Sequence, residues 1–99
     1  MNFSEALTLL KEGKCVTRLN WNGAGMWLFL VQGSEFKVNR APLNQHMPTG
    51  TEVKYRGHID MKTVDGSICV WTASQSDLLA DDWTEVKPRG FEGSGETSL

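Results

Sequence analysis

Apolar residues at the start of the chain recur at the spacing of an α-helix. Four of them stand at positions i, i+3, i+4 and i+7 and form one stripe: Phe3, Ala6, Leu7 and Leu10. Asn2 precedes this stripe and can cap the helix. Glu5 stands three residues after Asn2, which is the spacing of a capping box. Gly13 can adopt the left-handed conformation that ends a helix. The pattern predicts an N-terminal helix that buries one face.

Further along, short apolar or alternating segments predict strands separated by turns. We expect these strands at 15–18, 26–31, 35–38, 55–63, 67–71 and 83–86. Asp65 and Gly66 are typical of a two-residue hairpin turn, and Ser74 to Ala80 is expected to form a short helix capped by Ser74 and Asp77. The predicted fold class is α+β: a small twisted antiparallel sheet of about five strands, an N-terminal helix and a short second helix.

The segment from Met26 to Val31 is apolar at every position. Since successive side chains of a strand point to opposite faces, both faces of this strand need cover. One helix in a small domain can cover only one of them. The pattern therefore indicates a homo-oligomer, in which a second copy covers the other face. The alternative is that residues 33–53 fold over it.

Residues 39–50 and the end of the chain lack a clear periodic pattern. The first segment reads as a loop of roughly a dozen residues, which is long for a compact domain, and such loops often carry function. From Pro88 onward the sequence is rich in Gly, Ser and Glu and has little to bury. We therefore expect a single domain over 1–87 and a disordered C-terminal tail over 88–99.

Charge and composition narrow the classes of partner. The 99 residues carry a formal net charge of −2, which argues against DNA or RNA, since binding to phosphates usually needs a basic face. Residues 11–72 are net positive and residues 73–99 net negative, so the middle of the chain could hold a small anion. The apolar run from Met26 to Val31 is too short to span a membrane, and no secretory leader opens the chain. Cys15 and Cys69 lie in apolar segments, which indicates two buried, reduced thiols in a cytosolic protein.

Sequence patterns typical of enzymes are missing from the chain. His46 and His58 are the two histidines, and no HExxH, CxxC, GxSxG or phosphate-binding glycine loop occurs. Asp81 and Asp82 are adjacent and do not naturally converge, so we interpret them as solvated or capping acids. We expect no catalytic residue, no metal site and no cofactor.

The four tryptophans are the unusual feature of the composition. Trp27 and Trp83 stand in apolar strand contexts and are expected in the core. Trp21 lies in a polar turn, and Trp71 lies just before the N-terminus of the predicted second helix, where free backbone N–H groups suit an anion. Stacking faces beside hydrogen-bonding groups suit a nucleotide-like ligand. The alternative for Ser74 and Asp77 is that they only cap the helix.

Two groups of motifs resemble a phage and bacterial family, the second class of Thoeris anti-defence proteins, formerly a domain of unknown function. The opening matches are Asn2-Phe3-Ser4-Glu5-Ala6-Leu7, Gly13-Lys14, Arg18, Trp21-Asn22-Gly23 and Gly25-Met26. The closing matches are His58-Ile59-Asp60-Met61-Lys62-Thr63, Asp65-Gly66, Trp71, Ala73-Ser74-Gln75, Asp77-Leu78-Leu79-Ala80 and Asp82-Trp83. The resemblance covers residues 2–86.

This resemblance implies a small phage sponge protein. Such proteins bind the glyco-cyclic isomer of cyclic ADP-ribose, the signal made by an activated Thoeris TIR protein, and do not cleave it. Members are oligomers, tetramers among them, with pockets between protomers, and some hold cyclic dinucleotides at a separate site. The resemblance further implies immune evasion in the host bacterial cytoplasm, with neither a membrane nor a nucleic acid as partner.

Chemistry and resemblance together suggest a set of ligand-binding residues. They are Trp21, Asn22, Met26, Arg40, Trp71, Ser74, Gln75 and Asp77. We expect the two tryptophans to stack, Arg40 to pair with phosphate, Met26 to pack on a base or ribose, and the polar groups to bond sugar or base edges. Three further residues are held in reserve: Arg18, Arg56 and His58. Two other functions stay open, a protein-binding adaptor that inhibits a host factor and a nucleotide hydrolase.

Overall fold

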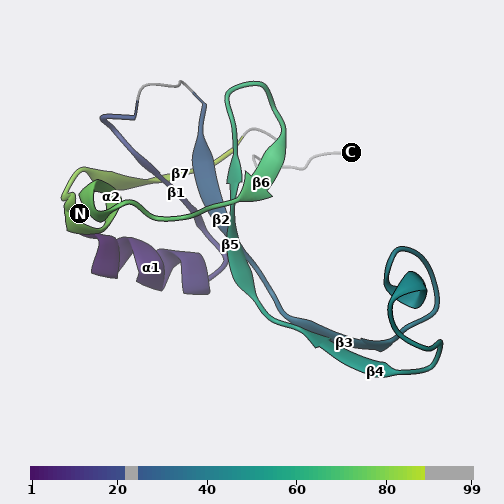
Figure 1. Cartoon of the computed structure of the whole chain (residues 1–99). Helices are drawn as coiled ribbons and strands as arrows, with labels where there is room; N and C mark the ends of the chain where they lie inside the picture. The colour runs from purple at the N-terminus through teal and green to yellow at the C-terminus, as the bar shows by residue number, and fades with distance from the viewer. Residues whose placement is uncertain (22–24, 89–99) are drawn as a thin grey trace, which may run out of the picture.

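The computed structural model describes residues 1–21 and 25–88, and its fold is α+β, as the sequence predicts (Figure 1). The described elements are, in chain order, α1 (Phe3–Lys11), β1 (Cys15–Arg18), β2 (Trp27–Val31), β3 (Ser34–Lys37), a 3-10 turn η1 (Leu43–Gln45), β4 (Glu52–Tyr55), β5 (His58–Lys62), β6 (Ile68–Val70), α2 (Gln75–Leu79) and β7 (Trp83–Val86). Five of the strands form an antiparallel sheet in the order β6-β5-β2-β1-β7, and β3 and β4 form a separate antiparallel pair.

The first helix, α1, begins and ends where the sequence predicts. The side chain of Asn2 accepts a hydrogen bond from the backbone N–H of Glu5 at 2.9 Å, and the side chain of Glu5 accepts one from the backbone N–H of Asn2 at 3.0 Å. Gly13 follows the helix with φ at +89°, a conformation that glycine adopts without a steric penalty. Ala6 and Leu10 are fully buried on the face that points to the sheet.

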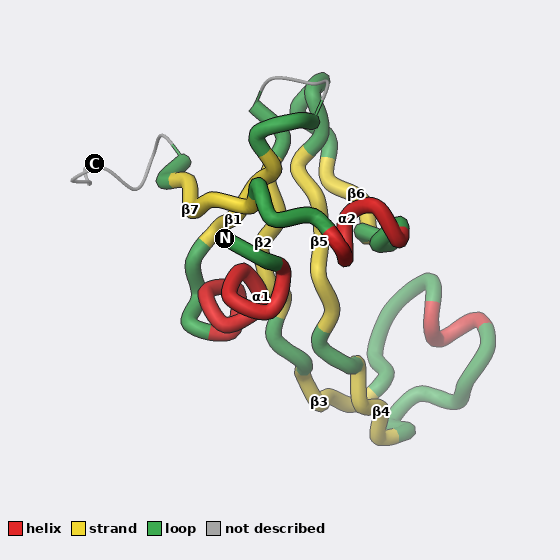
Figure 2. The backbone as a smooth tube through the Cα atoms, turned by 90° about the vertical axis from the view of Figure 1, so that its left-hand side faces the viewer, coloured by secondary structure: helices red, strands yellow, loops and turns green. Residues whose placement is uncertain are grey.

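One face of the five-stranded sheet is covered by α1 and by the segment that leads from β6 to α2 (Figures 1 and 2). Val16, Leu28 and Trp83 lie under this cover and are buried together with Ala6 and Leu10 of α1, and the partly buried Phe3 and Leu7 pack against them. Trp83 is only 2% exposed, so its assignment to the core is confirmed. The backbone N–H of Trp83 donates to the carbonyl of Met1, which ties the start of the chain to β7.

The opposite face of the sheet carries no helix of the described chain. In β2, the side chain of Leu28 points to α1, so those of its neighbours Trp27 and Phe29 point to the opposite face. There they pair across the sheet with Lys62 and Asp60 of β5. Trp27 is therefore half-buried and lies outside the central cluster, so its assignment to the core is wrong. The edge strand β6 extends this face with two exposed side chains, Ile68 and Val70. The side chains that share this face are called the open face: Trp27, Phe29, Val31, Asp60, Lys62, Ile68 and Val70.

Both cysteines are free thiols, and they differ in burial. Cys15 is buried, whereas Cys69 is exposed, so the expectation of two buried thiols is wrong for Cys69. The reason is its position in β6, a three-residue edge strand, while α1 packs on β1, β2 and β7.

Residues 33–57 form an arm that leads away from the five-stranded sheet (Figure 1). The alternative that residues 33–53 fold over β2 is therefore wrong, and the open face stays uncovered by this segment. The radius of gyration is 16.5 Å. A compact chain of 100 residues would have about 13 Å. The arm accounts for this extended shape.

The junction between arm and sheet is a close approach of two chain segments. A Cβ atom at Gly33 would lie 2.8 Å from the carbonyl oxygen of Tyr55, and one at Gly57 would lie 3.0 Å from that of Val31. Only glycine fits so close to a neighbouring backbone. The strand expected over 55–63 is broken at this junction, since β4 ends at Tyr55 and β5 begins at His58.

Candidate ligand-binding site

Aromatic side chains gather around Trp83 at the end of the sheet next to α2. The ring of Trp21 meets Trp83 edge-on, with centroids 5.3 Å apart at 79°, and Trp71 does so at 6.0 Å and 86°. Phe3 packs against both Trp71 and Trp83. The indole N–H of Trp83 donates to the carbonyl of Asp77 at 2.9 Å. Trp21 and Trp71 are half-buried, so each packs on the core and keeps part of its surface in contact with solvent.

The start of α2 uses Ser74 and Asp77 as a capping box. The Ser74 hydroxyl accepts from the backbone N–H of Asp77 at 3.0 Å, and the Asp77 carboxylate accepts from the backbone N–H of Ser74 at 3.2 Å. The capping role considered for these residues is confirmed. A carboxylate already occupies the helix N-terminus, so the backbone there is a poor place for a phosphate. Gln75 is exposed beside this cap.

Arg18 links the separate segments of this end of the molecule. Its Nε donates to Asp82 Oδ1 and its Nη1 donates to Asp77 Oδ1, each at 2.9 Å. Asp77 Oδ1 also accepts from the indole N–H of Trp21 at 3.1 Å, and Asp82 Oδ2 accepts from the backbone N–H of Asn20 at 2.9 Å. We call the group Arg18, Trp21, Asp77 and Asp82 the clamp.

The clamp shifts the ionisation of its members. Burial raises the pKa of Asp77, but hydrogen bonds from Arg18, Trp21 and Ser74 together outweigh it and hold that pKa below its ordinary value. The hydrogen bond from Arg18 is the main cause that lowers the pKa of Asp82. Both carboxylates are therefore charged at neutral pH. With one guanidinium between two carboxylates, the clamp carries a net negative charge.

Two members of the clamp were not placed in the site by the sequence. The sequence suggests Arg18 only as a reserve partner for phosphate, and it suggests Asp82 as a solvated or capping acid. That interpretation of Asp82 is wrong, because its side chain is only 16% exposed, pairs with Arg18 and accepts from the backbone N–H of Asn20, which belongs to no helix. The sequence offers one indication that Arg18 faces inward. Arg18 stands two positions after Val16, so in β1 its side chain lies on the same face as that buried residue.

Met26 lies near this end of the sheet. The antiparallel register that pairs Val16 with Leu28 places Met26 level with Arg18, and the hydroxyl of Thr17 donates to the Met26 carbonyl at 2.7 Å. Met26 is half-buried. Asn22, with Gly23, lies outside the described residues. The structure thus gathers six of the eight expected residues at one end of the sheet: Trp21, Met26, Trp71, Ser74, Gln75 and Asp77.

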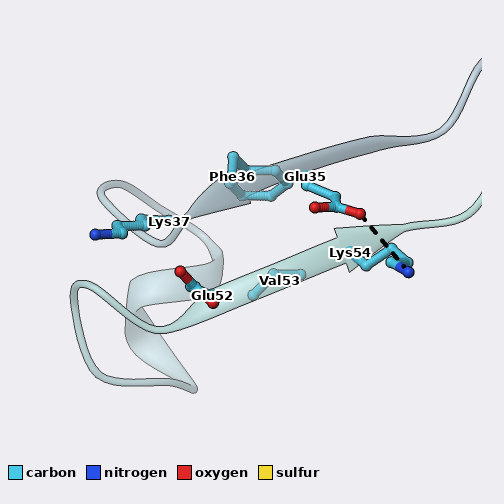
Figure 3. A pocket seen from close by; sticks show the side chains of 6 residues that line it. All are labelled: Glu35, Phe36, Lys37, Glu52, Val53 and Lys54. Atoms are coloured by element: carbon cyan, nitrogen blue, oxygen red, sulfur yellow. Dashed lines mark ion pairs between the residues drawn. The ribbon is translucent and has the colours of Figure 1, made fainter.

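Arg40 lies elsewhere, in the exposed loop between β3 and η1 at the far end of the arm. It lines a hollow of about 570 Å³ together with Lys37 and an edge-on aromatic pair, Phe36 and Tyr55, whose ring centroids are 5.0 Å apart. A second hollow, of about 400 Å³, runs along β3 and β4 beside the Lys54–Glu35 ion pair (Figure 3). Within one subunit, Arg40 is therefore not brought to the tryptophans.

The two other reserve residues also lie apart from the tryptophans. Arg56 is exposed at the junction of arm and sheet. His58 begins β5, and its Nε2 lies 3.3 Å from Asp60 Oδ1 on the open face, an ionic contact only when His58 is protonated. Asp60 Oδ1 is buried and makes no hydrogen bond to the described part of the chain.

Metal sites and membrane-spanning helices are two other features that a chain of this size can carry. Among the described residues, no three His, Cys, Asp or Glu side chains are grouped so that they could hold a metal ion. In the same part of the chain, no helix has the length and apolar character needed to cross a membrane.

Comparison with known proteins gives two matches. The profile of the Thoeris anti-defense 2-like domain matches residues 1–86. The chain is also similar to "Thoeris anti-defense 2" of Bacillus phage SP01, with 38% identity over 90 residues, which cover 87% of this chain and 94% of that protein. Both matches span the arm as well as the sheet.

Proposed function

Because the chain belongs to the Thoeris anti-defense 2-like family, we propose that it counters bacterial defence by binding glyco-cyclic ADP-ribose and withholding it intact. The observation that carries this proposal is the pair of half-buried indoles, Trp21 and Trp71, that flank Trp83 beside the polar residues at the start of α2. Family membership supports the anti-defence role, and the indoles support a ligand that contains an aromatic base.

Stacking can supply a substantial part of the required affinity. One base on an aromatic side chain contributes roughly 1–3 kcal/mol, and nanomolar binding needs about −12 kcal/mol. Each charge-assisted hydrogen bond to the pyrophosphate adds about 1.5–3 kcal/mol. Two stacking faces supply about 2–6 kcal/mol of this affinity, so hydrogen bonds and further contacts must supply the rest and also offset the cost of association.

The distribution of charge supports a site that is shared between copies. The tryptophan end of the sheet is acidic, because the clamp is net negative and Asp81 lies exposed beside it. A pyrophosphate therefore needs cations from elsewhere, and Arg40 and Lys37 stand at the far end of the arm. In our proposal, the arm of a second copy brings Arg40 to the ligand.

Uncovered apolar surface supports the same assembly. The open face exposes half of Ile68 and two thirds of Val70, and three exposed leucines stand within two residues of a clamp residue: Leu19, Leu78 and Leu79. Such surfaces mark contacts with other chains. We propose a homo-oligomer, a tetramer as in family members, that acts in the host cytoplasm where the signal is made. Cyclic dinucleotides are a second ligand class for a separate site.

The three functional alternatives predict different fates of the ligand. Protein is incubated with glyco-cyclic ADP-ribose, free ligand is measured, and the measurement is repeated after heat denaturation. A sponge depletes the ligand and returns all of it on heating. Loss without recovery would mean hydrolysis. No depletion, with cyclic dinucleotides tested in parallel, would favour an adaptor that binds a host protein.

A further inference from the structure

The guanidinium of Arg18 is enclosed by its own subunit. The side chains of Arg18, Asp77 and Asp82 are 16%, 13% and 16% exposed, and both ion pairs measure 2.9 Å. Two of its donor groups, Nε and Nη1, point at carboxylates of the same chain. The planar fork of arginine aims separate donors at the two carboxylates in fixed directions, whereas lysine offers one compact ammonium on a flexible stem.

The clamp joins three segments that are far apart in sequence. Arg18 ends β1, Asp77 lies 59 residues later in α2, and Asp82 lies 64 residues later just before β7. The remaining bonds of the two carboxylates hold the turn after β1, since Asp77 accepts from the Trp21 indole and Asp82 from the Asn20 backbone. The orientation of the Trp21 ring therefore depends on Asp77, which Arg18 holds in place.

We propose that Arg18 is a positioning residue for the ligand site, which fixes the Trp21 ring through Asp77 and does not itself bind the ligand. This inference rests on the proposed function, because it assigns Arg18 to the same site. An anion that approached Arg18 would meet two carboxylates around a single cation, so the cluster repels phosphate. Because the Trp21 ring is already held in the ligand-free protein, it loses less conformational entropy when the ligand binds, and the affinity is higher.

A double-mutant cycle separates positioning from direct contact. Arg18→Lys is measured in the wild-type background and in the Trp21→Phe background, where an aromatic plane remains but the indole donor is gone. We expect Arg18→Lys to weaken binding of glyco-cyclic ADP-ribose at least tenfold in the first background and less than threefold in the second. Equal losses in both backgrounds would mean that Arg18 contacts the ligand directly and would overturn the proposal.

A ligand-free measurement tests the clamp by itself. The indole N–H resonance of Trp21, assigned with Trp21→Phe, should shift and exchange faster with solvent in Arg18→Lys. Lys14→Gln, which removes an exposed cation four positions away, should leave it unchanged. If Arg18→Lys does not fold, Asp82→Asn removes one anchor of the guanidinium and should move the same resonance. An unmoved resonance in folded variants would overturn the proposal.

These two readouts keep the proposals distinct. If the wild-type protein binds no probe, the proposed function fails, and the Trp21 resonance alone decides whether Arg18 positions the ring. If Arg18→Lys lowers thermal stability but leaves both the affinity of the folded protein and the resonance unchanged, Arg18 has only a structural role.

Discussion

At the scale of single residues, the half-buried Trp21 and Trp71 each pack on the core and also offer a ring surface to solvent. Trp71 packs on Phe3 and Trp83, yet part of its surface faces solvent. We expect Trp71→Ala to weaken binding of glyco-cyclic ADP-ribose more than tenfold, because a stacking face is lost. Isothermal titration measures this effect. The free energy of unfolding should fall by about 1–3 kcal/mol, and the oligomer should persist.

The matched control for this substitution is Trp71→Phe, which keeps an aromatic plane and the contact with Trp83. It should retain most of the affinity. If Trp71→Ala binds as tightly as the wild type, Trp71 belongs to the core alone and contributes nothing to the site.

The carboxylates of the clamp set how stability depends on pH. The folded state lowers the pKa of Asp77 and Asp82, so their contribution is complete above the unfolded value of about 3.9 and is lost as the pH falls through the lower folded values. Asp65 behaves alike, since hydrogen bonds from Thr63 and Ser67 lower its pKa to about 2. We expect these carboxylates to add no pH dependence to stability between pH 5 and 8, and to make it fall below about pH 4.

Urea unfolding from pH 2.5 to 7 measures this dependence. Asp82→Asn should be less stable than the wild type at pH 7, and the difference should shrink as the pH falls, because protonation removes the charge of Asp82 in the wild type. A difference that stays constant over this range would contradict the role given to the Asp82 charge.

Residue roles with a local cause could be predicted from the sequence, and those with a distant cause could not. The capping box of Ser74 and Asp77 spans three residues, and its spacing is visible in the chain. Arg18 and Asp82 come together only because β1 pairs with β7. A hydrogen-bond partner 64 residues away leaves no local signal.

At the scale of elements, prediction succeeded wherever one face is buried. The stripe of α1 and the alternation of β5 both reflect the core; α1 forms where expected, and β5 forms within the segment 55–63 that was expected as one strand. The arm has little core of its own, because β3 is exposed at every position and β4 at three of four. Without a buried face there is no alternation to detect. This explains why β4 was not separated from β5.

The glycine junction should control the arm independently of the sheet. Gly33→Ala places a Cβ atom 2.8 Å from the Tyr55 carbonyl, so the arm must shift or its pairing must break. We expect this variant to keep its far-ultraviolet circular dichroism and to lose the oligomer, as measured by light scattering. Ser34→Ala, a change at the exposed neighbouring residue, is the control and should assemble normally. If Gly33→Ala assembles like the wild type, the position of the arm does not control oligomerisation, and this prediction is wrong.

For the whole molecule, the open face and the arm point to an assembly of several copies. A lysine in place of Val70, which is 66% exposed, should leave the folded subunit intact and weaken the oligomer, because a charge enters an apolar contact. Sedimentation velocity of Val70→Lys tests this. Val64→Lys is the matched control, since Val64 is 62% exposed in the turn before Asp65. Equal sedimentation of wild type and Val70→Lys would place the contact elsewhere.

Native mass spectrometry of the wild-type protein mixed with glyco-cyclic ADP-ribose tests the central claim most directly, because it reports copy number and ligand mass together. The account predicts an oligomer that carries the ligand at its unchanged mass, with ligands fewer than or equal in number to the subunits. A monomer that holds the ligand, or an oligomer that carries only a ligand of altered mass, would contradict it.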